Sequence, residues 1–159
     1  MAHEYRASVK WRRSGDAKFT DQRYSRGHEW SFDGGITVPA SSSPLSVRLP
    51  WSVAEAVDPE EALVAALASC HMLTFLYVAA KQGFVVDDYA DDAVGEMTKN
   101  EHGKFWVSKV TLSPQITFFG EKRPSPEQID ELHHLAHEEC YIANSVKSEV
   151  VVRGAMSFA

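Results

Sequence analysis

A long apolar segment constrains the fold of this chain more than any other feature of its sequence. The nineteen residues from Ala62 to Ala80 read ALVAALASCHMLTFLYVAA. The preceding Asp58-Pro59-Glu60-Glu61 combines a capping residue, a proline at the first helical position and a capping-box acid, and Gly83 marks the expected end. We therefore predict a central helix over residues 58–82. Because a surface helix would carry a polar stripe that this one lacks, we expect it to be buried on nearly every side.

Two environments could bury such a helix, a lipid bilayer or protein. Its length of roughly 28 Å is close to the thickness of a hydrocarbon core. However, the entry to the helix is acidic and Lys81 is its only basic flank. Four less apolar residues occupy its centre: Ser69, Cys70, His71 and Thr74. We therefore predict a protein without a membrane span. A chain of 159 residues is one modest domain, so the packing of two copies in a dimer would complete the burial.

A second helix has a clearer amphipathic signature. Ser125-Pro126-Glu127-Gln128 is a capping box with proline at the first helical position. Apolar residues then recur at three- and four-residue spacing: Ile129, Leu132, Ala136, Cys140 and Ala143. We predict a helix over residues 126–144 that turns Cys140 toward the core.

The rest of the chain alternates between apolar and polar residues as strands do. We predict strands within residues 3–40, with a turn at Asp33-Gly34-Gly35, and an irregular loop over 41–57. Further strands are predicted within 91–119, and a last strand over 147–153. Those within 91–119 are Ala93–Met97, Phe105–Leu112 and Gln115–Phe119. Because strands and helices do not alternate regularly, we expect a single α+β domain over residues 1–159.

Charge and cysteine content narrow the partners and the compartment. A formal net charge of −6 and a pI near 5.6 argue against nucleic acid as the main partner. The N-terminus has no apolar signal segment, so we expect a cytoplasmic protein. In a reducing compartment, two cysteines on separate helices indicate redox chemistry more than a structural disulfide.

Two motifs at defined spacing connect the chain to a known family. Cys70 follows Glu60 of the acidic motif by ten positions, and Cys140 follows seventy residues later on the second helix. From about Ser25 onward the chain resembles the OsmC/Ohr family, the osmotically inducible protein C-like and organic hydroperoxide resistance proteins. The resemblance implies an α+β OsmC-like fold, with antiparallel strands packed around two long helices and two chains in an intertwined homodimer.

One motif departs from the commoner form of the family. Cys140 is followed by Tyr141-Ile142-Ala143-Asn144-Ser145-Val146, where many members have proline and valine. The stretch from Tyr24 to Gly35 resembles a less-studied branch. The resemblance therefore defines the fold more closely than it defines the substrate.

The resemblance also implies a cysteine-based peroxidase, in which Cys70 attacks an organic hydroperoxide and Cys140 resolves the sulfenate as a disulfide. A peroxidatic cysteine reacts as the thiolate, and the family supplies the positive charge from an arginine held by the motif glutamate, here Glu60. Arg26 is the first candidate for this arginine and Arg48 the second. No cofactor is implied, and the reductant would be a lipoyl group, thioredoxin or a small thiol. The apolar surroundings of Cys70 favour fatty or aryl hydroperoxides as substrates.

Spacing along the central helix bears on the assembly. Glu60 and Cys70 are ten residues apart, about 15 Å along one helix axis, and do not share a stripe. Glu60 would therefore not easily serve the cysteine of its own helix. Two copies of the helix packed antiparallel would bring Glu60 of one chain near Cys70 of the other.

Alternatives from other classes remain open at this point. His133, His137 and Cys140 have spacing adequate for a metal site, with His71 or His28 as a further ligand. A non-catalytic ligand-binding dimer would instead line its pocket with four apolar residues: Phe75, Tyr77, Trp51 and Met72. Both cysteines could also be inert core residues, because free cysteine is commonly buried.

Overall fold

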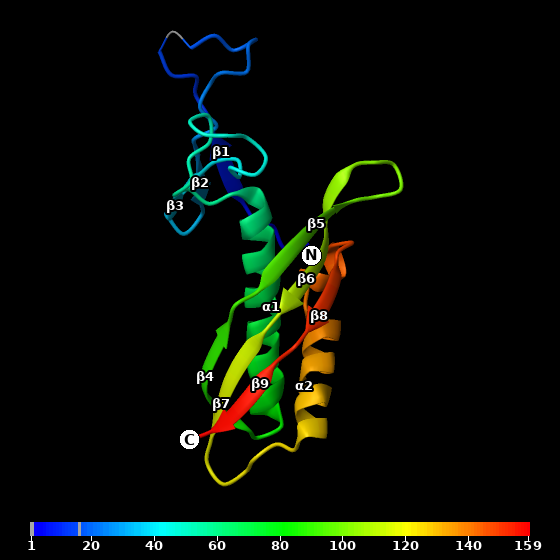
Figure 1. Ribbon diagram of the computed structural model, residues 1–159. Helices are drawn as coiled ribbons and strands as arrows, with labels where there is room; N and C mark the ends of the chain where they lie inside the picture. The colour runs from blue at the N-terminus through cyan, green and yellow to red at the C-terminus, as the bar shows by residue number, and fades with distance from the viewer. Residues whose placement is uncertain (1, 16) are drawn as a thin grey trace. The chain divides into compact units, whose positions relative to one another are not determined.

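The computed structural model of the chain describes residues 2–15 and 17–159 (Figure 1). Residues group into two compact units, Met1–Ala62 and Leu63–Ala159, and each is described separately. The central helix α1, Pro59–Lys81, begins in the first unit and continues through the second.

The first unit contains a three-stranded antiparallel sheet in the order β1-β2-β3. Its strands are β1 (Ala7–Lys10), β2 (His28–Phe32) and β3 (Thr37–Ala40). Trp30 at the centre of β2 pairs with Val9 on one side and Val38 on the other. Gly35, at a φ of 84°, makes the turn and donates its N–H to the Phe32 carbonyl at 3.0 Å. The predicted hairpin around Asp33-Gly34-Gly35 is therefore confirmed.

The segment 41–57 is irregular, as predicted, but hydrogen bonds hold it to the end of β3. Ala40 forms a parallel bridge with Val57, and the buried Ser41 hydroxyl accepts from the Val53 N–H at 3.0 Å. The segment leads into the predicted capping box: Glu61 N–H donates to Asp58 Oδ1 at 2.8 Å, and Asp58 N–H donates to Glu61 Oε2 at 3.3 Å. The chain thus enters α1 through a defined cap.

The second unit contains two further three-stranded sheets, in the orders β4-β7-β9 and β5-β6-β8. Their strands are β4 (Val85–Asp91), β5 (Val94–Lys99), β6 (Phe105–Leu112), β7 (Pro114–Phe119), β8 (Glu149–Val152) and β9 (Ala155–Phe158). The expectation of antiparallel strands is partly wrong, because β6–β8 and β7–β9 pair in parallel. The crossover through the second helix allows this direction. β4 and β9 were not predicted.

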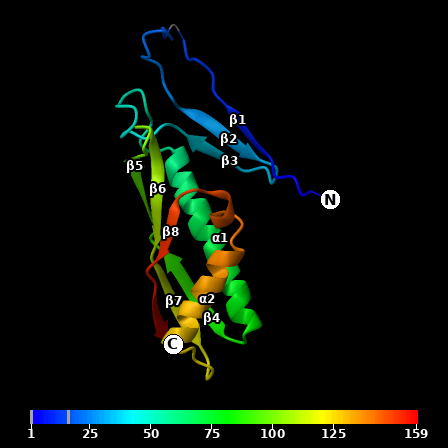
Figure 2. The same ribbon diagram turned by 90° about the vertical axis from the view of Figure 1, so that its right-hand side faces the viewer.

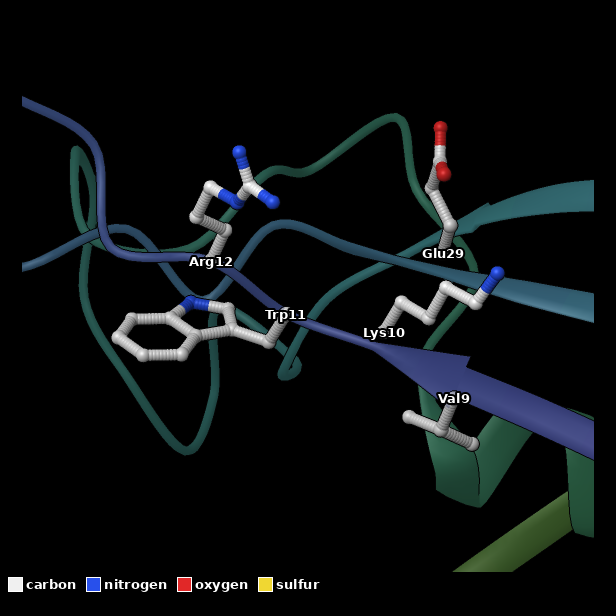
Figure 3. Close-up of a pocket in the computed structure, with 5 residues that line it drawn as sticks. All are labelled: Val9, Lys10, Trp11, Arg12 and Glu29. Atoms are coloured by element: carbon white, nitrogen blue, oxygen red, sulfur yellow. The ribbon is translucent and has the colours of Figure 1, made fainter.

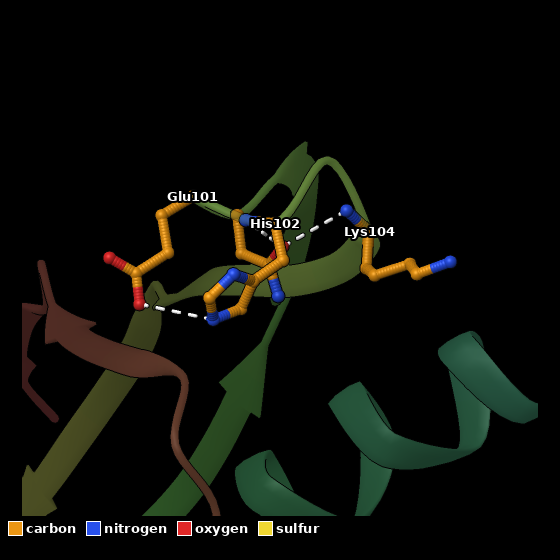
Figure 4. Close-up of polar contacts among 4 residues, drawn as sticks. Glu101, His102 and Lys104 are labelled. Atoms are coloured by element: carbon orange, nitrogen blue, oxygen red, sulfur yellow. Dashed lines mark hydrogen bonds and ion pairs between the residues drawn. The ribbon is translucent and has the colours of Figure 1, made fainter.

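The turn between β5 and β6 lies between the strands predicted over Ala93–Met97 and Phe105–Leu112. Asn100 Oδ1 accepts from the backbone N–H groups of His102 and Lys104, at 3.0 and 2.9 Å (Figure 4). Gly103, at a φ of 71°, donates its N–H to the Asn100 carbonyl at 2.9 Å. The asparagine side chain therefore stabilises the turn of this hairpin through hydrogen bonds to its backbone.

The second helix, α2, spans Pro126–Glu139 and lies beside α1 (Figure 2). Its predicted capping box is present, since Ser125 accepts from the Gln128 N–H and the Gln128 side chain accepts from the Ser125 N–H. The helix ends earlier than predicted: Cys140 is its C-cap, and a short 3-10 turn follows at Ala143–Ser145.

Both helices pack against the sheets of the second unit. One core cluster joins α1 and α2 to the β4-β7-β9 sheet: Phe75, Val78, Ala79, Phe84, Ile116, Phe118, Leu132 and Ala136. A second cluster joins α1 to the β5-β6-β8 sheet: Leu67, Val110 and Leu112. These two clusters hold α1 along one side.

The single chain buries α1 only in part, and the expected burial on nearly every side depends on a second copy. Only 22 % of an apolar stretch of 18 residues within this helix is buried. Residues at three- and four-residue spacing face outward along one line, here named the exposed stripe: Ala66, Ser69, Leu73, Tyr77 and Ala80. Leu73 is 61 % exposed and Tyr77 66 % exposed. The helix α1 is long and apolar enough to cross a membrane, a property that core helices of soluble proteins share.

Candidate functional site

The two cysteines meet at the contact between α1 and the end of α2. Cys140 is 1 % exposed, whereas Cys70 is half-buried on α1, and both are free thiols. The Cys70 side chain is close enough to Cys140 to raise the pKa of the Cys140 thiol. The structure therefore brings together the two thiols on which the sequence-based hypothesis depends.

The environment of Cys140 favours its protonated form. Burial raises the pKa of this thiol, and the interaction with the Cys70 side chain raises it further. The Ala143 N–H, which approaches Cys140 Sγ at 3.4 Å, acts in the opposite direction. Asn144 donates to the Cys140 carbonyl from its backbone N–H and its side-chain amide, both at 3.0 Å. These bonds fix the backbone of Cys140 at the helix end.

A buried pair of histidines joins the same two helices. His71 Nε2 lies 3.1 Å from His133 Nδ1, and the rings are stacked at an interplanar angle of 12°. Burial, with smaller contributions from His133 and His137, lowers the pKa of His71 to about 4. Burial also lowers the pKa of His133, while Asp130 acts to raise it. Both rings are therefore neutral at physiological pH.

The sequence analysis did not predict that His71 and His133 contact each other. His133 was considered only as a metal ligand together with His137 and Cys140, and His71 only as a candidate fourth ligand from elsewhere in the fold. The usable signal was the position of each residue: His71 lies in the apolar run of α1, and His133 follows the buried Leu132. Histidines in such places need a partner, because burying an unpaired polar group is costly.

The alternative metal site is not formed. Among the described residues, no group of three or more histidine, cysteine, aspartate or glutamate side chains could hold a metal ion. His133 turns to His71 instead. His28 is also engaged, with Nδ1 2.7 Å from the Arg26 carbonyl and Nε2 3.0 Å from the Trp30 indole nitrogen.

Three of the residues expected to line the pocket of the non-catalytic alternative lie on α1, and they differ in burial. Phe75 is fully buried in the core against Phe118 and His133, with ring centroids 6.5 and 4.6 Å away. Tyr77 belongs to the exposed stripe, and Met72 is half-buried. Phe75 and Tyr77 therefore do not line one cavity.

The residues expected to activate Cys70 lie in the first unit. Arg26 Nη1 donates to the carbonyls of Gln22 and Tyr24, each at 2.6 Å, and the guanidinium carbon lies 3.9 Å from the Tyr24 ring centroid. Arg48 is exposed, and Glu60 is half-buried in the first turn of α1. The roles of Arg26, Arg48 and Glu60 at the thiol stay predictions.

The first unit also has a hollow of about 640 Å³, lined by Val9, Lys10, Trp11, Arg12 and Glu29 (Figure 3). The Trp11 indole donates to the Ser25 carbonyl at 2.8 Å. The hollow contains none of the predicted site residues, and its lining is exposed. It therefore adds no group to the thiol chemistry.

Comparisons with known proteins agree with this architecture. The sequence model of the OsmC-like protein family matches residues 52–153. The crystal structure of an OsmC-like protein of unknown function from Vibrio cholerae is similar, with 52 % identity and a TM-score of 0.94. That match covers 97 % of this chain and 100 % of the other. No match was found among curated proteins.

More distant structures share the fold. An organic hydroperoxide resistance protein from Elizabethkingia anophelis matches with 17 % identity and a TM-score of 0.68, over 100 % of both chains. The organic hydroperoxide resistance protein OhrB of Bacillus subtilis matches with 20 % identity and a TM-score of 0.57, over 96 % of this chain and 98 % of the other. With its α+β architecture of two helices and three small sheets, the chain belongs to the OsmC-like family.

Proposed function

We propose that this protein is a thiol-dependent peroxidase that reduces organic hydroperoxides to alcohols. The observation that carries the proposal is the contact between a half-buried Cys70 and a buried, protonated Cys140. Two neighbouring thiols of unequal exposure are suited to a reaction in which one attacks and the other resolves. Two distant relatives are named organic hydroperoxide resistance proteins, which supports the same chemistry.

The reaction proceeds in two balanced steps. The Cys70 thiolate attacks the outer oxygen of the hydroperoxide, the O–O bond breaks, and the alkoxide takes a proton and leaves as the alcohol. Cys70 is then a sulfenic acid. The Cys140 sulfur attacks the Cys70 sulfur, the S–O bond breaks, and the hydroxyl leaves with the thiol proton as water. A dithiol or two small thiols reduce the resulting disulfide.

The thiolate of Cys70 needs a positive charge, which we assign to Arg26 held by Glu60. To reach a thiolate, Arg26 would have to exchange its bonds with the Gln22 and Tyr24 carbonyls for charged partners, which form stronger hydrogen bonds. Arg48, an exposed residue of the loop before α1, is the second candidate.

We also propose a homodimer formed through the exposed stripe of α1. A single chain leaves Leu73 and Tyr77 largely exposed on this helix, and a second copy is the occupant that would cover them. An antiparallel copy would place Glu60 of one chain near Cys70 of the other, which overcomes the 15 Å separation along one helix.

The remaining parts of the proposal concern substrate, reductant and compartment. The apolar residues beside Cys70 on α1, among them Leu73 and Met72, favour fatty or aryl hydroperoxides over hydrogen peroxide. The chemistry of the two thiols requires no bound cofactor. A lipoyl group, thioredoxin or a small thiol would serve as the reductant, and the reducing cytoplasm is the expected compartment.

Free-thiol titration with intact-mass measurement tests the proposal. Wild type, Cys70→Ser and Cys140→Ser are compared before and after one equivalent of cumene hydroperoxide, in the presence of a chelator. We expect wild type to lose both thiols with the formation of one disulfide. Cys70→Ser should not react, and Cys140→Ser should gain one or more oxygen atoms at Cys70.

The two single-cysteine variants serve as controls for each other, because they remove one sulfur each from the same contact. Persistence of both thiols in wild type would reject the peroxidase and leave a binding protein as the explanation. Oxidation of Cys140 in the Cys70→Ser variant at the wild-type rate would reverse the assigned roles.

A further inference from the structure

Besides the apolar packing between α1 and α2, two contacts between polar or sulfur-containing side chains start from neighbouring positions of α1. Cys70 meets Cys140 at the end of α2, and the next residue, His71, meets His133 two turns earlier in α2. The mechanism proposed above uses only the first contact. The second is buried and polar, and nothing in the proposed chemistry explains it.

The histidine contact is directional. Two neutral imidazoles have one N–H each, so one of the facing nitrogens donates and the other accepts across the 3.1 Å between them. The outer nitrogens, His71 Nδ1 and His133 Nε2, have no hydrogen-bond partner among the residues that the structure describes. The bond between the two rings is therefore the only hydrogen bond that these buried imidazoles form within the described part of the chain.

The surroundings hold the two rings close together. The Phe75 ring, one turn after His71 on α1, packs against His133 with centroids 4.6 Å apart. On the other side, a Cβ at Gly154 would lie 3.1 Å from His133 Nε2, so the glycine leaves the room that this ring occupies. The contact between the helices at this point is thus set by the rings and has little freedom to adapt.

We propose that the His71–His133 pair is a positioning contact: it sets the spacing of α1 and α2 at which the Cys140 thiol reaches Cys70. This rests on the proposed function, because it assumes that the two cysteines form a disulfide. Packed interfaces shift between discrete arrangements more readily than they deform, so the loss of this hydrogen bond would move the end of α2 that carries Cys140. The pair acts through the dithiol and touches neither the substrate nor the reacting atoms.

The disulfide equilibrium tests the proposal without any hydroperoxide. Reduced protein is equilibrated at neutral pH with oxidised and reduced dithiothreitol, which exchanges one disulfide for one dithiol. His133→Leu removes the hydrogen bond, whereas His133→Asn keeps an amide atom near the position of Nδ1. His134→Asn alters the exposed neighbour, which pairs with Glu138 at 3.3 Å, and serves as the matched control.

We expect His133→Leu to lower the equilibrium constant for the Cys70–Cys140 disulfide by about tenfold or more, because the thiols lose effective concentration. His133→Asn and His134→Asn should each stay within about twofold of wild type. An unchanged equilibrium constant in His133→Leu, together with a lower free energy of unfolding, would overturn the proposal and leave the pair as a core contact.

A measurement on wild type covers the case in which His133→Leu fails to fold. Coupling between two sites is reciprocal, so formation of the disulfide must change the proton affinity of the histidine pair. We expect the imidazole NMR signals of His71 and His133 to titrate at different pH values in reduced and disulfide forms, by about threefold in proton affinity. Identical titration in the two forms would overturn the proposal. A protein that forms the disulfide but does not reduce hydroperoxides would reject only the proposed function.

Discussion

Cys140 and Cys70 are neighbouring cysteines, but they differ in burial. Burial and the neighbouring Cys70 side chain raise the pKa of the Cys140 thiol, and the exposure of Cys140 is only 1 %. Cys70 is half-buried beside the exposed stripe. The sequence placed both cysteines on helices but gave no measure of this difference, because burial depends on which elements pack against each sulfur.

The difference predicts unequal alkylation of the two thiols. In the native reduced protein, iodoacetamide should modify Cys70 at least about ten times faster than Cys140, since the reagent needs an accessible thiolate. Rates measured by mass spectrometry on Cys140→Ser and Cys70→Ser give each value separately. Equal rates in the two variants would contradict the assignment of Cys140 as the protected thiol.

The buried histidines predict a loss of stability in mild acid. The pKa of His71 falls from 6.5 in the unfolded chain to about 4 in the fold, so the unfolded state binds more protons between these values. The free energy of unfolding therefore decreases as pH falls from 6.5 toward 4, by on the order of 3 kcal/mol for this residue. His133 acts in the same direction, since its pKa is also lowered, although nearby Asp130 opposes part of that change.

Urea denaturation at several pH values checks this prediction. Wild type should lose stability across the window, and His71→Gln, which keeps an amide near Nε2 but does not titrate, should show a shallower dependence. The exposed His134 provides the control, because His134→Asn should retain the wild-type slope. A wild-type slope in His71→Gln would show that other groups cause the acid response.

At the scale of elements, local signals predicted the structure well and non-local ones did not. The capping boxes at Asp58 and Ser125 are present as expected, because each involves residues only three positions apart. The strand Val85–Asp91 escaped prediction because its aspartates disfavour a strand. In the structure, a register shift between Val86 and Asp88 accommodates them. The parallel pairing of β6 with β8 depends on contacts between distant segments, and no local pattern encodes it.

The same distinction applies to the candidate site. Cys70 and Cys140 were selected as the only two cysteines of the chain and by their spacing from Glu60, and their roles stay predictions. The histidine pair escaped prediction because residues 71 and 133 meet only when α1 and α2 pack together. The proposed roles of Arg26 and Glu60 at Cys70 likewise depend on how chains assemble. The sequence therefore indicates these roles only through the family resemblance.

The close contact between strand β5 and helix α1 gives a further prediction. Gly95 of β5 lies against α1, where an added Cβ would be 2.6 Å from Val64 Cγ2 and 3.4 Å from Val107 Cγ1. Because valine is stiff, the helix or the strand would have to move. Gly95→Ala should therefore lower the free energy of unfolding by about 1–3 kcal/mol.

A double-mutant cycle provides the control for this prediction. Val64→Ala removes the methyl group that the new Cβ would meet, so the double variant should be more stable than the sum of the two single changes predicts. Thermal or urea unfolding of all four proteins gives the coupling. Strict additivity would show that the close approach of β5 to α1 does not limit residue size at position 95.

For the whole molecule, the exposed stripe of α1 is the feature that a single chain leaves unexplained. Apolar side chains of this size on one helix face usually mark an interface. We expect wild type to have a mass in solution of about twice the 17.7 kDa of one chain, measured by light scattering after size-exclusion chromatography. Leu73→Glu should shift the mass toward that of one chain, because a buried carboxylate is costly.

Phe105→Glu is the matched control for dimer formation. Phe105 is 67 % exposed, similar to Leu73, but lies on β6 outside the stripe. The control should keep the wild-type mass. A wild type that is monomeric at all concentrations would contradict the dimer and, with it, the sharing of Glu60 between chains.

The division of the chain into two units within α1 determines how the protein can be taken apart. The unit boundary falls between Ala62 and Leu63, inside a helix whose cap is made by Asp58 and Glu61. A fragment that starts at residue 63 would begin in mid-helix, with the uncapped N–H groups of its first turn exposed. A C-terminal piece that keeps the cap must therefore begin at or before Asp58, and an N-terminal piece cut at the boundary would end in the first turn of the helix.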